Sequence, residues 1–135
     1  MLKYMLDTNI AIYIIKNRPD DVREIFNTRS GQACMSSVSL MELVYGAEKS
    51  ASPARNLRVI EGFSARLEVL PYDDNAAMHT GQIRAELAQR GKPIGPYDQM
   101  IAGHARSQGL VLVTNNTKEF KQVPGLRLEN WAGKK

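Results

Sequence analysis

The chain opens with Leu2-Lys3-Tyr4-Met5-Leu6-Asp7-Thr8-Asn9, a short apolar run that ends abruptly in polar residues. A run of this length suits a buried strand, and Thr8 or Asn9 can cap a helix directly after it. The same succession of apolar run and helical pattern recurs along the 135 residues. Strands that alternate with helices are typical of βαβ units in a mostly parallel sheet. The opening segment therefore predicts an α/β fold.

The remaining elements follow from the same two patterns. The predicted strands are the apolar runs at residues 2–6, 33–36, 67–70, 110–114 and 126–128. The predicted helices carry an apolar face at helical spacing or begin at a proline, and they cover the segment from Thr8 to its end at Pro19, then residues 20–27, 37–49, 53–66, 74–90 and 96–109. The run at residues 110–114 is the clearest buried strand.

The composition is that of an ordinary globular protein, with 43% hydrophobic and 24% charged residues. Its length predicts a single domain spanning residues 1–135. Cys34 is the only cysteine, which excludes an intrachain disulfide and a cysteine-rich zinc site. No signal peptide precedes Asp7, and no run approaches the roughly 20 apolar residues of a membrane span. The expected location is the cytoplasm, with no membrane partner.

Basic residues outnumber acidic residues by 18 to 14, which gives a net charge of +4 and an isoelectric point near 9.3. This bias suits a polyanionic partner such as RNA, but many proteins without such a partner share it. The basic residues are dispersed, so solvated helix faces explain any one group of them equally well. The candidates for RNA contact are Lys49, Arg90, Lys92 and Lys118.

Two carboxylates lie where burial would be costly. Asp7 follows the first strand, at the edge of the sheet where open α/β folds bind ligands, although aspartate also caps helices well. Glu42 lies in a helix that is apolar nearly all round and should be buried. Ser39-Leu-Met-Glu42 also fits a capping box, in which the glutamate satisfies a backbone N–H. A ligand role and a capping role are open for both residues.

Further acidic and amide residues follow the same logic. Asp98 shares a helix face with Ile101 and Ala105, which predicts that it points toward the core; the alternative is a favourable interaction with the helix dipole, worth about 0.3–1 kcal/mol. Asn116 and Glu119 follow the clearest strand, where a simple turn is the alternative. Clustered carboxylates hold Mg²⁺ against a phosphodiester. The set therefore predicts a divalent-metal site.

The two histidines do not compete for this site. His104 lies six residues beyond Asp98 on a different face of the predicted helix, and His79 is isolated. Motif spacing therefore provides no zinc site and no Ser-His-Asp arrangement. The sequence also lacks the GxxxxGK[ST] phosphate-binding loop.

At these residues the sequence resembles the PIN-domain ribonucleases and, among them, the VapC toxins of bacterial toxin–antitoxin pairs. The resemblance covers essentially the whole chain. It rests on four strings in a fixed order, which are Met5-Leu-Asp7-Thr-Asn9, Ser36-Ser-Val-Ser-Leu-Met-Glu42-Leu with Tyr45-Gly46, Gly95-Pro-Tyr-Asp98-Gln-Met-Ile-Ala-Gly-His104-Ala, and Val113-Thr-Asn-Asn116 leading to Phe120. It implies a three-layer α/β/α sandwich around a mostly parallel five-stranded sheet.

The resemblance also implies roles for particular residues. Asp7, Glu42 and Asp98 would be catalytic and metal-binding carboxylates, with Mg²⁺ as the cofactor and Mn²⁺ as a substitute. The residues that would support these carboxylates or a second ion are Thr8, Asn9, Thr114, Asn116 and Glu119. Asn116 departs from the pattern, because many PIN domains carry an aspartate there, and this weakens the expectation of a second ion.

The implied function is that of a toxin of a type II toxin–antitoxin pair: an Mg-dependent endoribonuclease that hydrolyses a structured RNA, often a tRNA anticodon loop, and so inhibits translation. The implied partners are a cognate VapB-type antitoxin that covers the site, a second copy in a homodimer, and operator DNA only through the antitoxin. Two other classes stay open: a non-catalytic binding module, for which Asn116 is the best argument, and a phosphoacceptor receiver domain, which would need a second acidic residue after the first strand.

Overall fold

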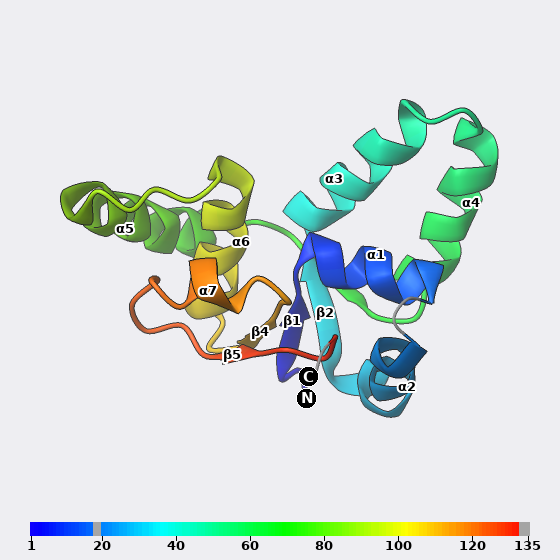
Figure 1. Ribbon diagram of the computed structural model, residues 1–135, viewed down its shortest axis with the longest axis horizontal. Helices are drawn as coiled ribbons and strands as arrows, with labels where there is room; N and C mark the ends of the chain where they lie inside the picture. The colour runs from blue at the N-terminus through cyan, green and yellow to red at the C-terminus, as the bar shows by residue number, and fades with distance from the viewer. Residues whose placement is uncertain (18–19, 133–135) are drawn as a thin grey trace.

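The computed structural model describes residues 1–17 and 20–132, and within them five strands form one sheet. The strands are β1 (Tyr4–Leu6), β2 (Ala33–Ser36), β3 (Glu68–Leu70), β4 (Val111–Val113) and β5 (Leu128–Glu129). Their order is β3-β2-β1-β4-β5, and each neighbouring pair is parallel. The predicted α/β fold with a five-stranded parallel sheet is confirmed (Figure 1).

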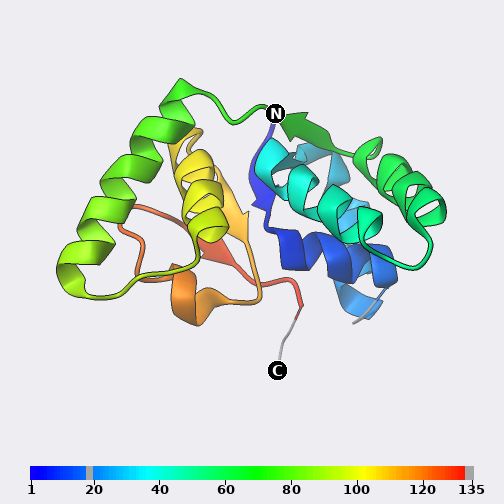
Figure 2. The same ribbon diagram turned by 90° about the horizontal axis from the view of Figure 1, so that it is seen from above.

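Helices cover both faces of this sheet (Figure 2). On one side lie α1 (Thr8–Lys16), α2 (Asp20–Arg29), α3 (Ser37–Glu48) and α4 (Pro53–Ser64). On the other side lie α5 (Asp74–Arg90) and α6 (Pro96–Ser107), while the short elements are η1 (Ser30–Gln32) and α7 (Thr117–Phe120). No helix within the described ranges has the length and apolarity needed to cross a membrane.

Alternation along the strands explains the two cores. Successive strand residues point to opposite faces, so a sheet covered on both sides needs apolar residues at every position. In β1, Tyr4 and Leu6 pack into the core beneath α1, α2 and α4, whereas Met5 packs into the core beneath α5 and α6. Residues of β2 and β4 divide in the same way. The continuous apolar runs of the sequence therefore encode a central sheet.

Close packing of α5 against α6 fixes the helix that carries Asp98. An ideal Cβ at Gly103 would lie 2.8 Å from the backbone N and Cα of Thr80, so only glycine lets the two helices approach this closely. The two helices meet over much of their length at the left of Figure 2. The start of α6 is thereby held at a defined place beside the sheet.

The helix boundaries differ from the predictions mainly at their ends. The N-cap of α1 is Asp7, rather than Thr8 or Asn9, and α1 ends at Lys16, followed by the C-cap Asn17 with a left-handed φ of 58°. The predicted helix end at Pro19 lies outside the described residues. The other helices begin at the predicted residues and end within two residues of the predicted ends.

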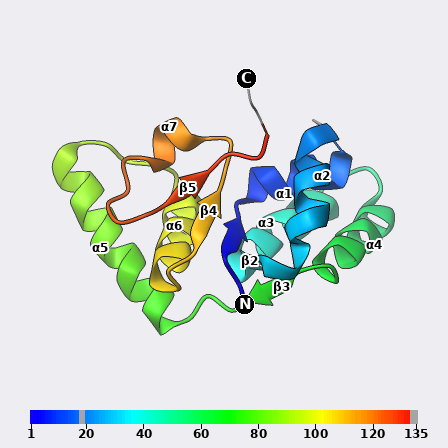
Figure 3. The same cartoon turned by 90° about the horizontal axis from the view of Figure 1, so that it is seen from below.

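The last strand and one helix were not predicted correctly. The strand expected at residues 126–128 is instead Leu128–Glu129, because Leu112 and Val113 pair with these two residues, while Leu126 packs against the core from the preceding loop. The Asn-rich segment after β4 contains α7, which is only four residues long. Figure 3 shows β5 beside β4, with α7 near the connection between them.

Candidate active site

A cavity of about 240 Å³ lies at the carboxyl edge of the sheet. Because the strands are parallel, the segments that follow β1, β2 and β4 meet at this edge. The cavity is lined by Asp7, Thr8, Asn9, Glu42, Asp98, Asn116 and Phe120. The structure therefore brings the three predicted catalytic carboxylates together, along with three of the five predicted supporting residues.

Asp7 caps α1 and also lines the cavity. Its side chain is 3% exposed, and its Oδ1 accepts a hydrogen bond from the backbone N of Ile10 at 2.8 Å, which caps α1. The hydroxyl of Thr114, which is fully buried behind the cavity, also hydrogen-bonds to Asp7. Asp7 is thus both the helix cap and a wall of the cavity, held by donors from two elements.

Glu42 does not cap its helix. The N-cap of α3 is Ser36, whose Oγ accepts from the backbone N of Val38 at 3.0 Å, so the capping-box alternative is wrong. Glu42 lies in the second turn and is half-buried. Its Oε1 accepts a hydrogen bond from Thr8 Oγ1 at 2.5 Å. A residue of α1 therefore holds this carboxylate at the cavity.

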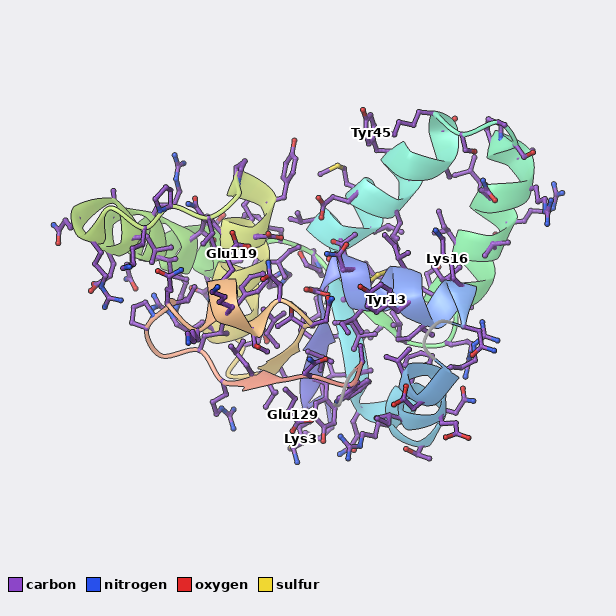
Figure 4. All side chains as sticks on the ribbon, in the orientation of Figure 1. Lys3, Tyr13, Lys16, Tyr45, Glu119 and Glu129 are labelled. Atoms are coloured by element: carbon purple, nitrogen blue, oxygen red, sulfur yellow. The ribbon has the colours of Figure 1, made fainter. Side chains whose placement is uncertain are left out.

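Asp98 lies half-buried in the first turn of α6, at the wall of the cavity rather than inside the core. Its carboxyl group can hydrogen-bond to that of Glu119 when one of the two is protonated, and Glu119 Oε1 accepts from Asn116 Nδ2 at 2.7 Å. Figure 4 labels Glu119 on α7, close to α6. Glu119 thus stands behind Asp98 and Asn116, and it adds a fourth carboxylate to this corner of the molecule.

The surroundings of Asp7 and Asp98 favour the protonated, neutral form of their carboxyl groups. Burial, with a smaller contribution from the charge of Glu42, raises the pKa of Asp7 from 3.8 to about 6, against the lowering effect of its hydrogen bonds to Thr114 and Ile10. Burial also raises the pKa of Asp98 to about 6, followed by the charges of Glu119, Asp7 and Glu42. Carboxylates that repel one another in this way are stabilised by a bound cation.

The donor set fits a hard divalent cation. Its side-chain donors are oxygens and amides, and no histidine or cysteine lines the cavity. Among the described residues, no three His, Cys, Asp or Glu side chains converge closely enough to hold an ion by themselves. Mg²⁺ usually keeps several waters and takes only one or two carboxylates directly. The arrangement therefore suits a partly hydrated Mg²⁺ or Mn²⁺ better than an ion enclosed by protein.

The four basic residues predicted to contact RNA are exposed, and none is among the residues that line the cavity. The ammonium of Lys49 lies 4.8 Å from the centre of the Tyr45 ring, and Arg90 pairs with Glu86 at 2.9 Å. Lys92 follows α5, and Lys118 lies on α7. Their contact with RNA stays a prediction.

The sequence did not identify two residues of the site. Phe120 lines the cavity from α7, a helix that the sequence did not predict. Ser39 was considered only as a helix cap, yet it is fully buried and its Oγ lies 3.1 Å from Thr8 Oγ1. Its position one helical turn before Glu42 was the available signal. His104, by contrast, lies outside the cavity, with its Nδ1 2.8 Å from Ser36 Oγ.

An apolar groove of about 320 Å³ adjoins the carboxylate cavity. It runs between α1, α3 and α4, and Glu42 belongs to both lining sets. Its walls are made by Ile12, Ile15, Lys16, Glu42, Leu43, Gly46, Ala47, Asn56, Val59 and Ile60. Lys16 lies between α1 and α4 in Figure 4. The groove is therefore an apolar surface with charged groups placed along it.

Comparison with known proteins agrees with this geometry. The model of the PIN domain family matches residues 4–126. The tRNA(fMet)-specific endonuclease VapC of Shigella flexneri is 67% identical over 132 residues, which cover 98% of this chain and 100% of that protein. Ribonuclease VapC2 of Haemophilus influenzae (strain ATCC 51907 / DSM 11121 / KW20 / Rd) is 56% identical over 97% of this chain and 99% of its own length.

Solved structures agree as well. The DNA-bound VapBC of Salmonella typhimurium superposes with a TM-score of 0.93 at 65% identity, over 97% of this chain and 99% of that chain. VapBC2 of Rickettsia felis, bound to a DNA fragment from its promoter, gives 0.90 at 39% identity, over 96% and 99%. The chain therefore belongs to the PIN-domain family and, within it, to the VapC ribonucleases, which confirms the resemblance inferred from the four sequence strings.

Proposed function

We propose that this protein is the toxin of a toxin–antitoxin pair and that it hydrolyses initiator tRNA within the anticodon loop, in the cytoplasm, as one domain spanning residues 1–135. The observation that supports this most is the cavity that gathers Asp7, Glu42 and Asp98 in a chain 67% identical to a tRNA(fMet)-specific endonuclease. An anticodon loop offers unstacked bases and an accessible backbone, which a shape-reading protein can engage.

The proposed roles follow from the contacts of each carboxylate. Asp7 and Asp98 would hold Mg²⁺ directly, and Glu42 would hold it directly or through a water. Asp7 is kept in place by its bonds to Ile10 and Thr114, and Glu42 by its bond from Thr8. Asn116 and Glu119 would support Asp98 through the hydrogen bonds that join them.

A divalent ion bound here supplies positive charge that stabilises the phosphodiester transition state and promotes ionisation of water. Asp7, Glu42 and Asp98 would hold that ion at the edge of the sheet, beside the position of the scissile phosphate. Attack by water rather than by the RNA 2′-hydroxyl leaves a 5′-phosphate and a 3′-hydroxyl. Mn²⁺ should replace Mg²⁺, because both accept oxygen ligands.

A cognate VapB-type antitoxin is the proposed inhibitory partner. Supporting this, the structural relatives from Salmonella typhimurium and Rickettsia felis are VapBC assemblies bound to DNA. The groove between α1, α3 and α4 would bind an apolar segment of the antitoxin. Because Glu42 lines both the groove and the cavity, an arginine at the end of that segment would lie beside the carboxylates. Operator DNA would be contacted only through the antitoxin, and a homodimer is proposed on family resemblance.

Cleavage of defined tRNAs tests the proposal. Purified protein is incubated with initiator tRNA and with elongator methionine tRNA, in Mg²⁺, in Mn²⁺ and in excess EDTA, and the ends of the products are mapped. We expect cleavage of the initiator tRNA in either metal, with 5′-phosphate ends and none in EDTA. Cleavage that persists in EDTA would overturn the metal assignment, and equal cleavage of both tRNAs would overturn the substrate.

A further inference from the structure

Two hydroxyl groups connect the walls of the carboxylate cavity. Thr8 is the first residue of α1 and follows Asp7 directly, and its Oγ1 lies 2.5 Å from Glu42 Oε1 and 3.1 Å from Ser39 Oγ. Glu42 and Ser39 both belong to α3, one turn apart. The contact therefore joins the segment that carries Asp7 to the helix that carries Glu42.

The direction of these hydrogen bonds follows from the chemistry of the groups. A threonine hydroxyl has a single hydrogen, and an ionised carboxylate only accepts. A separation of 2.5 Å is typical of a hydroxyl that donates to a carboxylate, so Thr8 donates to Glu42. The remaining contact is then made by the Ser39 hydroxyl, which donates to Thr8 Oγ1. The donors run from Ser39 through Thr8 to Glu42.

We propose that Thr8 and Ser39 are positioning residues that fix the Glu42 carboxylate at a set separation from Asp7, and that this fixed separation makes the cavity prefer Mg²⁺ over Ca²⁺. The inference rests on the proposed function, because it takes the carboxylates as ligands of a divalent ion. In this proposal the Thr8 and Ser39 hydroxyls contact neither the ion nor the RNA. Both act through Glu42.

The need for such positioning differs between the two carboxylates. Asp7 has a short side chain, its backbone N donates to Val113 O at 3.0 Å, and its Oδ1 is held by Ile10. Glu42 has one more rotatable bond and is half-buried, and Thr8 donates the side-chain hydrogen bond that holds it. Without the Thr8 hydroxyl, Glu42 would sample several rotamers at the edge of the cavity.

The relative affinity for Mg²⁺ and Ca²⁺ should show whether Glu42 has become mobile. Mg²⁺ requires near-ideal octahedral geometry at about 2.0–2.1 Å, whereas Ca²⁺ accepts six to eight oxygens in a flexible arrangement. A mobile Glu42 should therefore weaken Mg²⁺ binding more than Ca²⁺ binding. A hydroxyl pair that only fastened α1 to α3 would instead lower the melting temperature and leave the relative affinities unchanged.

The test measures Mg²⁺ and Ca²⁺ affinity of the whole chain by isothermal titration calorimetry, with melting temperatures in EDTA as a measure of stability. The variants are Thr8→Val, Thr8→Ser and Ser39→Ala. The matched control is Thr80→Val, because Thr80 is a buried threonine on α5 whose hydroxyl donates to Ala76 O at 2.8 Å, away from the cavity.

We expect Thr8→Val to weaken Mg²⁺ binding by about 10–100-fold, as loss of an outer-shell partner usually does, and Ca²⁺ binding by much less. Thr8→Ser keeps the donor and should retain the wild-type ratio of affinities. Ser39→Ala acts one bond further away and should shift that ratio in the same direction by a smaller factor. Thr80→Val should lose stability without changing the ratio.

An unchanged ratio of Mg²⁺ to Ca²⁺ affinity in Thr8→Val would overturn the inference while leaving the proposed function intact. Should that variant not fold, an unchanged ratio in Ser39→Ala would overturn it instead. A wild-type protein that binds neither ion would overturn the metal assignment itself, and with it the inference.

Discussion

The carboxylate cavity and the apolar groove share Glu42 and differ in almost every other respect. The cavity is built largely from residues next to strand ends and helix starts, and burial, with the charges of neighbouring carboxylates, raises the pKa of Asp7 and of Asp98. The groove is built from the middle of α1, α3 and α4, and its walls are mostly aliphatic. The cavity therefore suits the proposed catalysis, whereas the groove suits the proposed docking of the antitoxin.

The contrast shows how one helix serves both surfaces. Glu42 lies on α3 where the polar and apolar surfaces meet, while Leu43, Gly46 and Ala47 continue into the groove. The antitoxin segment proposed for the groove would therefore end beside the carboxylates. If the two surfaces act independently, a change in one should leave the other unaffected.

The largest effect should come from Asp98→Asn. We expect cleavage of tRNA to fall by more than about 100-fold, because loss of a direct ligand should cost at least as much as loss of an outer-shell partner. The melting temperature in EDTA should be unchanged or higher, since one of several mutually repelling charges is removed. Cleavage assays and thermal melts check this; cleavage within about 10-fold of wild type would count against a direct role for Asp98.

Asp7, in the cavity, should make the stability of the protein depend on pH. The pKa of Asp7 is about 6 in the folded protein and 3.8 ordinarily, so between these values the folded state binds more protons than the unfolded state. The free energy of unfolding should therefore fall as pH rises from 4 through 6, by up to about 3 kcal/mol from Asp7. Below pH 4 this penalty is absent.

Urea denaturation in EDTA at pH 5 and pH 7 measures this effect. Asp7→Asn cannot ionise at this position, so its free energy of unfolding should change less between the two pH values than that of the wild type. Saturating Mg²⁺ should offset the loss at pH 7, because an ion that binds only the folded state stabilises it. Identical pH dependence in the two proteins would contradict a raised pKa for Asp7.

Gly46→Leu should affect the groove alone. A Cβ at Gly46 meets no atom within 4 Å, so the leucine should be accepted by the free chain while it occupies the groove. We expect antitoxin binding to weaken by about 10-fold or more, which corresponds to about 1.4 kcal/mol, with cleavage unchanged. Titration of antitoxin against cleavage activity measures both quantities, and undiminished inhibition would remove the groove from the proposed interface.

Gly46→Ala provides the smallest change at the same position. Alanine in a helix interior is favoured over glycine by about 0.8–1.0 kcal/mol, and the added methyl group faces open space. The free protein should therefore melt at a slightly higher temperature, with antitoxin binding nearly unchanged. A lower melting temperature would show that the groove closes on Gly46 in solution.

The parallel sheet and most of the carboxylate cavity could be predicted from the sequence. A charged residue in apolar surroundings, such as Glu42, is conspicuous in any sequence, and parallel strands bring Asp7 and Asn116 to the same edge. The groove could not be predicted in this way. Ile12, Ile15 and Val59 have the spacing of core residues, and nothing local tells an open apolar wall from a filled one.

The remaining misses also have physical causes. β5 is short and its position is set by pairing with Leu112 and Val113, which are far away in the sequence. The helix α7 has only four residues, too few for any periodicity to show. The contact between Ser39 and Thr8 depends on two helices meeting in space, so the sequence could single out Thr8 but not its partner on α3.

The central claim is that Asp7 serves as a metal ligand besides capping α1, and one set of thermal melts tests it most directly. Asp7→Asn keeps an oxygen that can accept from Ile10 N but removes the charge, and Asp73→Asn is its matched control, because Asp73 caps α5 by accepting from Ala76 N at 3.0 Å. Wild type and both variants are melted in EDTA and in Mg²⁺. We predict that Mg²⁺ stabilises the wild type and Asp73→Asn equally and stabilises Asp7→Asn much less, with Asp7→Asn at least as stable as wild type in EDTA. An undiminished Mg²⁺ shift in Asp7→Asn would contradict the account.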